Sequence, residues 1–393
     1  MSSFGSSPSH AWVCTWLSTS QPTTGEAFPF PLEIPTLLNN QTLQQTLRIT
    51  LGGQQLRLVF SNRYGTKPLV LGENTIVVNS PSGKSWSAPV LFNGQSGVSI
   101  PAEQVVYSDE IIHPIDDLSE VTLRTYLPAP TLVETFHWDA RHYSQLTSGN
   151  GVHSKTTKES LPISSRLLLE AVEIQNQAPS QAIVVIGDSM VDGNGVEMGT
   201  YHRWVDFLAE RAVSQHTAVI NAGQSGSRLL KDGIGISTLS RFTRDVIEQA
   251  GVTTCVVQVG LNDIGLAQTA LAPADMTPSA SQLIEGYRQL LDIAHQHNIR
   301  VVGITLVPLR CTDEYGLDNF YTPEKDAIRQ EVNEWIRTSG EFDALIDTEQ
   351  LVRDSQNPQQ LALIYDSGDH LHLNHAGHQW VANSISLDTV IGV

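Results

Sequence analysis

Short apolar runs in the second half of the chain alternate with longer stretches of helical character. The runs are "AIVVIG", "AVIN", "CVVQVG", "RVVGITLV" and "ALID", and helix-like stretches such as "ASQLIEGYRQLLDIAHQH" separate them. Five strands that alternate with helices predict a doubly wound, mostly parallel sheet in three layers. We therefore expect an α/β domain over residues 176–393, with its site where the strands end and the helices begin.

The first half has a different rhythm, and it favours antiparallel strands. In "LRITLGGQQLRLVF" apolar residues alternate on both sides of Gly52 and Gly53, which indicates a β-hairpin. "NTIVVN", "GVSI", "EVTLRTYL" and "RLLLEAVEI" continue the series. The rhythm changes near "QNQAPSQ", Gln175–Gln181. We expect an all-β, sandwich-like domain over residues 1–175.

Charge and cysteine content exclude several classes of protein. The formal net charge of −18 disfavours nucleic acid and anionic membrane surfaces as partners. Cys14, Cys255 and Cys311 lie far apart without a CxxC spacing, so neither a disulfide framework nor a zinc knuckle is indicated, and Cys255 lies in a run typical of a core strand. No apolar run approaches membrane-spanning length. We expect a cytoplasmic protein, or a secreted one if a signal peptide has been removed; the oligomeric state is not indicated.

Polar residues that suit acyl transfer follow the predicted strands. "GDS" ends the first run, "NAGQSG" follows the second, "GLNDIG" follows the third, and "GDHLHLNHAGH" lies near the C-terminus. Ser189 can act as nucleophile with His372 as its base, and Asp369 is close enough in sequence to orient the imidazole. Backbone N–H groups of Ser189 and Gly226 and the amide of Asn262 can stabilise an oxyanion. This mechanism needs neither metal nor organic cofactor.

The blocks "GDSMVDG", "NAGQSG", "GLND" and "DHLHLN" resemble, in order, the four signature blocks of the SGNH hydrolases, the GDSL esterase and lipase superfamily. The resemblance implies a flavodoxin-like fold and an acyl-serine mechanism. It places the nucleophile on Ser189, the oxyanion glycine on Gly226 rather than Gly223, the oxyanion asparagine on Asn262 and the Asp-x-x-His pair on Asp369 and His372. "LRITLGGQQLRLVFSNRYGTKPL" is similar to the β-rich N-terminal domain of two-domain, acetylxylan-esterase-like bacterial members.

The resemblance implies a serine esterase for short acyl esters, acetyl first, of carbohydrates or small alcohols. A lysophospholipase, a thioesterase or an acyltransferase can use the same residues, and the non-enzymatic alternative is a carbohydrate-binding protein with a degenerate esterase domain. Hydrolysis of p-nitrophenyl esters from acetate to decanoate would distinguish an esterase for short acyl groups from a lipolytic enzyme.

Structural roles compete with the catalytic ones at several positions. Asn262 and Asp263 suit a simple turn, Gly226 suits a backbone with positive φ, and we expect Asp188 to support the turn that carries Ser189. The cluster of His370, His372, His375 and His378 also suits a metal site, although His375 and His378 are expected on the solvated face or the end of a final helix. Phe136, Trp138 and Tyr143 suit either a sugar platform, a wall over the site, or core packing.

Overall fold

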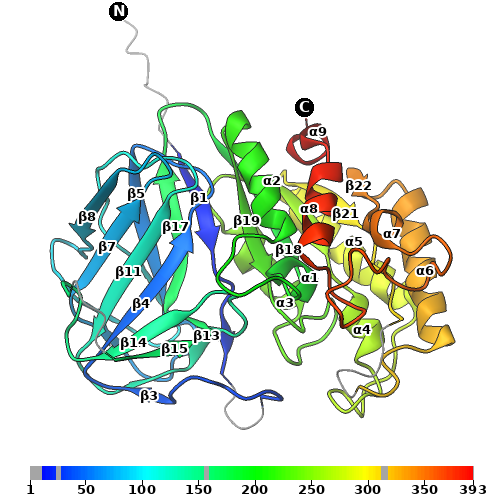
Figure 1. Cartoon of the computed structure of the whole chain (residues 1–393), viewed down its shortest axis with the longest axis horizontal. Helices are drawn as coiled ribbons and strands as arrows, with labels where there is room; N and C mark the ends of the chain where they lie inside the picture. The colour runs from blue at the N-terminus through cyan, green and yellow to red at the C-terminus, as the bar shows by residue number, and fades with distance from the viewer. Residues whose placement is uncertain (1–10, 24–27, 155–158, 311–316, 393) are drawn as a thin grey trace, which may run out of the picture.

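The computed structural model describes residues 11–23, 28–154, 159–310 and 317–392. An antiparallel β part and a parallel α/β part lie side by side, on the left and right of Figure 1. Cys14 and Cys255 are free thiols in the buried interior, as expected for Cys255, whereas Cys311 lies outside the described residues.

Two antiparallel sheets build the N-terminal part, which confirms the sandwich-like fold. In the larger sheet, strands such as β11 alternate buried and more exposed residues, the pattern of a sheet with one face on the core. Its strands, in spatial order, are β15 (Ser160–Ile163), β14 (Ser144–Ser148), β4 (Gln41–Arg48), β11 (Glu120–Leu127), β7 (Asn74–Asn79) and β8 (Ser85–Pro89). The other sheet contains β1 (Trp12–Leu17), β17 (Leu169–Gln175), β5 (Gln55–Ser61) and β10 (Val105–Tyr107).

Short strands complete this part of the molecule. They are β2 (Gln21–Pro22), β13 (Thr135–His137) and β16 (Arg166–Leu167) in one small sheet, β3 (Leu37–Leu38) with β12 (Thr131–Leu132), and β6 (Leu69–Leu71) with β9 (Val98–Ile100).

The hairpin predicted around Gly52 and Gly53 is wrong. Strands β4 and β5 lie in different sheets: β4 pairs with β11 and β14, and β5 pairs with β17 and β10. Both glycines contact the segment 115–117. The Asp117 carboxylate accepts a hydrogen bond from the Gly52 N–H at 2.7 Å. The apolar alternation therefore fits two strands that face one core from opposite sheets, which a sequence pattern cannot distinguish from a hairpin.

A five-stranded parallel sheet forms the centre of the C-terminal part, as predicted. Its spatial order is β19 (Thr217–Gly223), β18 (Gln181–Gly187), β20 (Val252–Gln258), β21 (Arg300–Ile304) and β22 (Ala344–Ile346). In chain order this is 2-1-3-4-5, the flavodoxin-like order. Strand β18 is buried along almost its whole length, which explains its unbroken apolar sequence.

Helices cover both faces of this sheet and give the three expected layers (Figure 1). Helix α2 packs on β19 and α8, whereas α5 packs on β21, α3 and α6. Ser279 starts α5 by capping the N–H of Gln282 in a capping box. The helices are α1 (Ser189–Asp192), α2 (Trp204–Ala212), α3 (Thr238–Phe242), α4 (Leu261–Gly265), α5 (Ala280–Gln296), α6 (Pro323–Thr338), α7 (Thr348–Val352), α8 (His375–Ser384) and α9 (Leu387–Ile391), with a π-helical turn at Thr243–Ile247 and a 3-10 turn at Val213–Gln215.

The topology reverses between β18 and β20, where a ligand site is expected at the carboxyl ends of the strands. Strand β1 of the N-terminal part lies against β19, so the two parts meet beside this region (Figure 1). None of the helices in the described ranges is both long and apolar enough to cross a bilayer.

Candidate active site

Ser189 lies at the first residue of α1, directly after β18. Gly187 ends the strand, and a Cβ there would lie 2.2 Å from the Gln258 carbonyl oxygen, so only glycine fits beside β20. Asp188 caps α1 by accepting a hydrogen bond from the Met190 N–H at 3.0 Å, the supporting role expected for it. This turn presents the Ser189 hydroxyl at the carboxyl edge of the sheet.

Ser189, His372 and Asp369 form a continuous chain of hydrogen bonds. The Ser189 Oγ lies 2.8 Å from His372 Nε2, and His372 Nδ1 lies 2.7 Å from Asp369 Oδ2. Residues separated by 183 positions in the chain are thus in contact. In this geometry His372 can accept the hydroxyl proton at Nε2, while Nδ1 keeps its proton and donates it in a hydrogen bond to the Asp369 carboxylate.

The carboxylate of Asp369 is held by its own loop. Its Oδ1 accepts hydrogen bonds from the backbone N–H groups of Leu371 at 2.8 Å and His372 at 2.7 Å. Burial alone would raise the pKa of Asp369, but the side chain and backbone N–H of His372 outweigh burial and hold this pKa well below its usual range. Asp369 therefore stays ionised and stabilises a positive charge on the imidazole.

Gly226 lies in the loop after β19, and Asn262 lies in the short helix α4 after β20. Gly226 has φ of +77°, and a Cβ there would lie 2.7 Å from the side chain of Ile234. The amide of Asn262 donates to the Ser227 carbonyl at 3.0 Å, which leaves its second N–H for another acceptor. In the described part of the chain no acceptor pairs with the Gly226 N–H. The first N–H of a helix, here that of Ser189, also lacks an intrahelical partner.

Asn262 and Asp263 do more than form a turn. They belong to the one-turn helix α4, and the Asp263 carboxylate accepts from the N–H groups of Leu229 at 2.6 Å and Leu230 at 2.9 Å. Burial raises the pKa of Asp263 to about 6 and that of Asp188 to about 7. Asp263 thereby links α4 to the loop that carries Gly226.

The histidines near the C-terminus contact different residues. His370 contacts the carboxylate of Asp366, His375 packs against the rings of His202 and Phe207, and His378 Nδ1 accepts from the Trp204 N–H at 3.1 Å. Among the described residues, no group of three or more His, Cys, Asp or Glu side chains has the geometry of a metal site.

The expectation that His378 is solvated is wrong. His378 is fully buried, because α8 packs on α2 and turns this face of the helix inward, whereas His375 is exposed as expected.

The three aromatic residues from "ETFHWDARHY" do not share a surface. Phe136 is a core residue, Trp138 stacks on Phe30 at 4.7 Å, and Tyr143 is exposed. A single sugar platform built from all three is therefore excluded.

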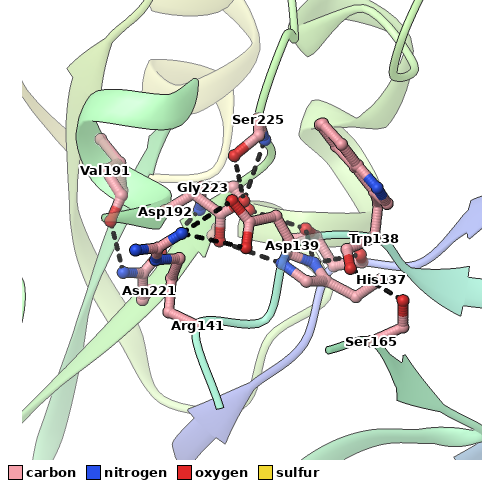
Figure 2. A network of polar contacts seen from close by, with 12 residues as sticks. His137, Trp138, Asp139, Arg141, Ser165, Val191, Asp192, Asn221, Gly223 and Ser225 are labelled. Atoms are coloured by element: carbon pink, nitrogen blue, oxygen red, sulfur yellow. Dashed lines mark hydrogen bonds and ion pairs between the residues drawn. The ribbon is translucent and has the colours of Figure 1, made fainter. Parts of the chain in front are cut away.

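Sequence reasoning missed two buried polar groups behind the site. Arg241 on α3 donates to the carbonyls of Gly187 at 2.7 Å and Ala222 at 2.8 Å, and so joins the ends of β18 and β19. His137, from β13 in the N-terminal part, contacts Asp192 on α1 at 3.0 Å (Figure 2). No periodicity or motif marks either residue, because their partners are distant in sequence.

A known protein family matches the C-terminal part of the chain. Residues 185–380 match the model of the GDSL-like Lipase/Acylhydrolase family. No curated protein sequence matches the chain.

Solved structures similar to part of this chain include two esterases and an α/β hydrolase.

 The values for the acetyl xylan esterase AlAXEase are 18% identity over 51% of this chain and 96% of its own, with a TM-score of 0.37. An inhibitor-bound aryl esterase from M. smegmatis has 14% identity over 52% of this chain and 95% of its own, with a TM-score of 0.40. An α/β hydrolase enzyme, LAE5, from the metagenome of Lake Arreo has 21% identity over 52% of this chain and 93% of its own, with a TM-score of 0.37.

Proposed function

The part of the chain over residues 185–380 belongs to the GDSL-like lipase/acylhydrolase family, and from this premise we propose that the protein is a serine esterase that cleaves carboxylic esters through an acyl-serine. The observation that carries the proposal is the unbroken chain from Ser189 Oγ to His372 Nε2 at 2.8 Å and from His372 Nδ1 to Asp369 at 2.7 Å. A weak nucleophile, a base and a group that orients the base are the three parts that acyl transfer requires.

In the proposed reaction, Ser189 Oγ attacks the ester carbonyl carbon while His372 Nε2 takes the hydroxyl proton. The N–H groups of Ser189, Gly226 and the Asn262 amide stabilise the negative charge on the carbonyl oxygen. His372 then gives its proton to the leaving alcohol, and the acyl-serine remains. Water repeats the sequence, releases the acid and restores the Ser189 hydroxyl.

The proposed substrates are short acyl esters, acetyl first, of carbohydrates or small alcohols. The preference for a short acyl group comes from the sequence resemblance alone. Longer acyl chains would indicate a lipolytic enzyme, and thioesters a thioesterase, with the same nucleophile. A non-catalytic carbohydrate-binding protein would not require the contact between Ser189 and His372.

The test is hydrolysis of p-nitrophenyl esters from acetate to decanoate by the full chain and by Ser189→Ala. We expect release of p-nitrophenol to be fastest for acetate, and we expect Ser189→Ala to abolish it without changing the unfolding transition. Mass spectrometry after rapid quenching should find the acyl group on Ser189. Retained turnover in Ser189→Ala would contradict the assignment of the nucleophile, and a maximum at decanoate would contradict the short acyl group.

A further inference from the structure

His137 reaches from the β part of the molecule to the helix that carries Ser189. It lies at the end of β13, is 7% exposed, and contacts Asp192 Oδ1 through Nε2 at 3.0 Å. Asp192 Oδ2 accepts from both the N–H of Ser225 at 2.9 Å and its hydroxyl at 2.8 Å. Ser225 directly precedes Gly226, so His137 is two contacts away from the predicted oxyanion loop (Figure 2).

Both ring nitrogens of His137 face hydrogen-bond acceptors. Nδ1 lies 2.9 Å from the carbonyl oxygen of Thr19, which accepts only. It also lies 3.1 Å from the Thr19 hydroxyl, whose proton is directed to the Gly223 carbonyl at 2.9 Å. Nε2 faces the carboxylate of Asp192. A neutral imidazole has one N–H and can satisfy only one of these sides, whereas an imidazolium satisfies both.

The charges around His137 agree with a protonated ring. Burial alone would lower the pKa of His137, but the carboxylate of Asp192 outweighs burial and raises it, and Asp139 adds to the effect. Arg166 and Arg203 line the same small cavity and oppose protonation. Arg203 is paired with Asp206 at 2.8 Å, which offsets much of its charge.

We propose that His137, held as an imidazolium between Thr19 and Asp192, is a positioning residue for the oxyanion loop. The loop is then fixed at two points: Thr19 binds the Gly223 carbonyl, and Asp192 binds Ser225. Both anchors depend on the β part, which thus sets the direction of the Gly226 N–H. This inference rests on the proposed function, and it assigns to the β part an effect on the chemical step.

The protonation state has a direct test that does not depend on activity. Nitrogen-15 NMR of the full chain labelled at histidine, with His137→Gln to assign the signal, should show two protonated ring nitrogens on His137 at pH 7. A neutral ring at pH 7 would overturn the proposal. His142 provides a matched reference, because it is 8% exposed at the same boundary and burial lowers its pKa to about 3.

The positioning role is tested by kinetics with p-nitrophenyl acetate. We expect His137→Gln to lower kcat by about tenfold or more with KM changed less than about twofold, because loss of one oxyanion donor costs about 100-fold and displacement costs less. His142→Gln should leave both constants near those of the wild type. Equal kinetics in His137→Gln and wild type would overturn the proposal, as would a change confined to KM.

A second variant, Ser225→Ala, tests the same loop without changing His137, and the double variant is compared when both single variants fold. Ser225→Ala removes the hydroxyl contact to Asp192 and should also lower kcat at constant KM. The double variant should be no more than about threefold below the lower single variant, because both changes act on one loop. Independent, multiplying effects of the two changes would contradict the proposal.

Hydrogen exchange separates this inference from the proposed function. The Ser225 amide should exchange faster in His137→Gln than in wild type, and in His142→Gln it should not. Faster exchange of the Ser225 amide in a protein that hydrolyses no ester would support the positioning role of His137 and reject the esterase function. Unchanged exchange of this amide in an active esterase would reject the positioning role alone.

Discussion

The carboxylate of Asp369 has a close counterpart three residues earlier in the same loop. Asp366 accepts from the N–H groups of Gly368 and His370 and contacts the His370 ring, much as Asp369 accepts from Leu371 and His372. Only the second pair reaches Ser189. The two pairs therefore separate the effect of a carboxylate on loop structure from its effect on the nucleophile.

Replacing Asp369 with Asn should lower kcat for p-nitrophenyl acetate by about 1,000-fold or more. The amide can present an N–H to His372 Nδ1 and so favour the tautomer that cannot accept the Ser189 proton, and it carries no charge to stabilise the imidazolium. Steady-state kinetics measure the change. Asp366→Asn is the control and should stay within about threefold of wild type. A similar loss in both variants would show that loop structure, rather than the charge at Asp369, is responsible.

At the scale of elements, a buried arginine helps to fix α3 to the sheet. Arg241 is 1% exposed and donates to the carbonyls at the ends of β18 and β19. Its charge is balanced by Asp245 at 2.9 Å, in the π-helical turn that follows α3. The ends of these two strands carry the turn with Ser189 and the loop with Gly226, so α3 sets the spacing between them.

We expect Arg241→Met to lower the free energy of unfolding by about 3–5 kcal/mol, because it leaves a buried carboxylate without one of its partners and two strand-end carbonyls without donors. Urea denaturation followed by circular dichroism measures the loss. Arg288→Met, on the exposed surface of α5, is the matched control and should change stability little, because an exposed ion pair contributes little. Equal stability of the two variants would contradict the structural role of Arg241.

For the whole molecule, the features that could be predicted are those marked by a periodic apolar pattern or by a short sequence motif. The apolar runs predicted the parallel strands, and the spacing Asp369-x-x-His372 predicted the contact within that loop. Long-range polar contacts outside these motifs could not be predicted, because nothing in the sequence links His137 to Asp192 or Arg241 to Gly187. Pairing also depends on tertiary structure, which is why β4 and β5 entered different sheets although their alternation suits a hairpin.

Hydrogen bonds tie the β part to the α/β part at several separate places. The Cys14 N–H donates to the Ala250 carbonyl at 2.8 Å, and the Gln21 amide donates to the Ile234 carbonyl at 3.0 Å. Arg48 pairs with Glu210 at 2.7 Å, and Arg244 donates to the Tyr64 hydroxyl at 2.7 Å. Together with the contact between His137 and Asp192, these hydrogen bonds and ion pairs stabilise the two parts against separation.

We therefore expect the two parts to unfold together in one transition. Separation would break the buried pair of His137 and Asp192 and leave charges without partners, which costs more than an exposed ion pair can return. Differential scanning calorimetry should show a single peak whose calorimetric and van't Hoff enthalpies agree. His137→Gln removes the buried pair and should broaden or split this peak, whereas His142→Gln should not. Two peaks in the wild type would mean that the parts are energetically independent and that the contacts between them contribute little.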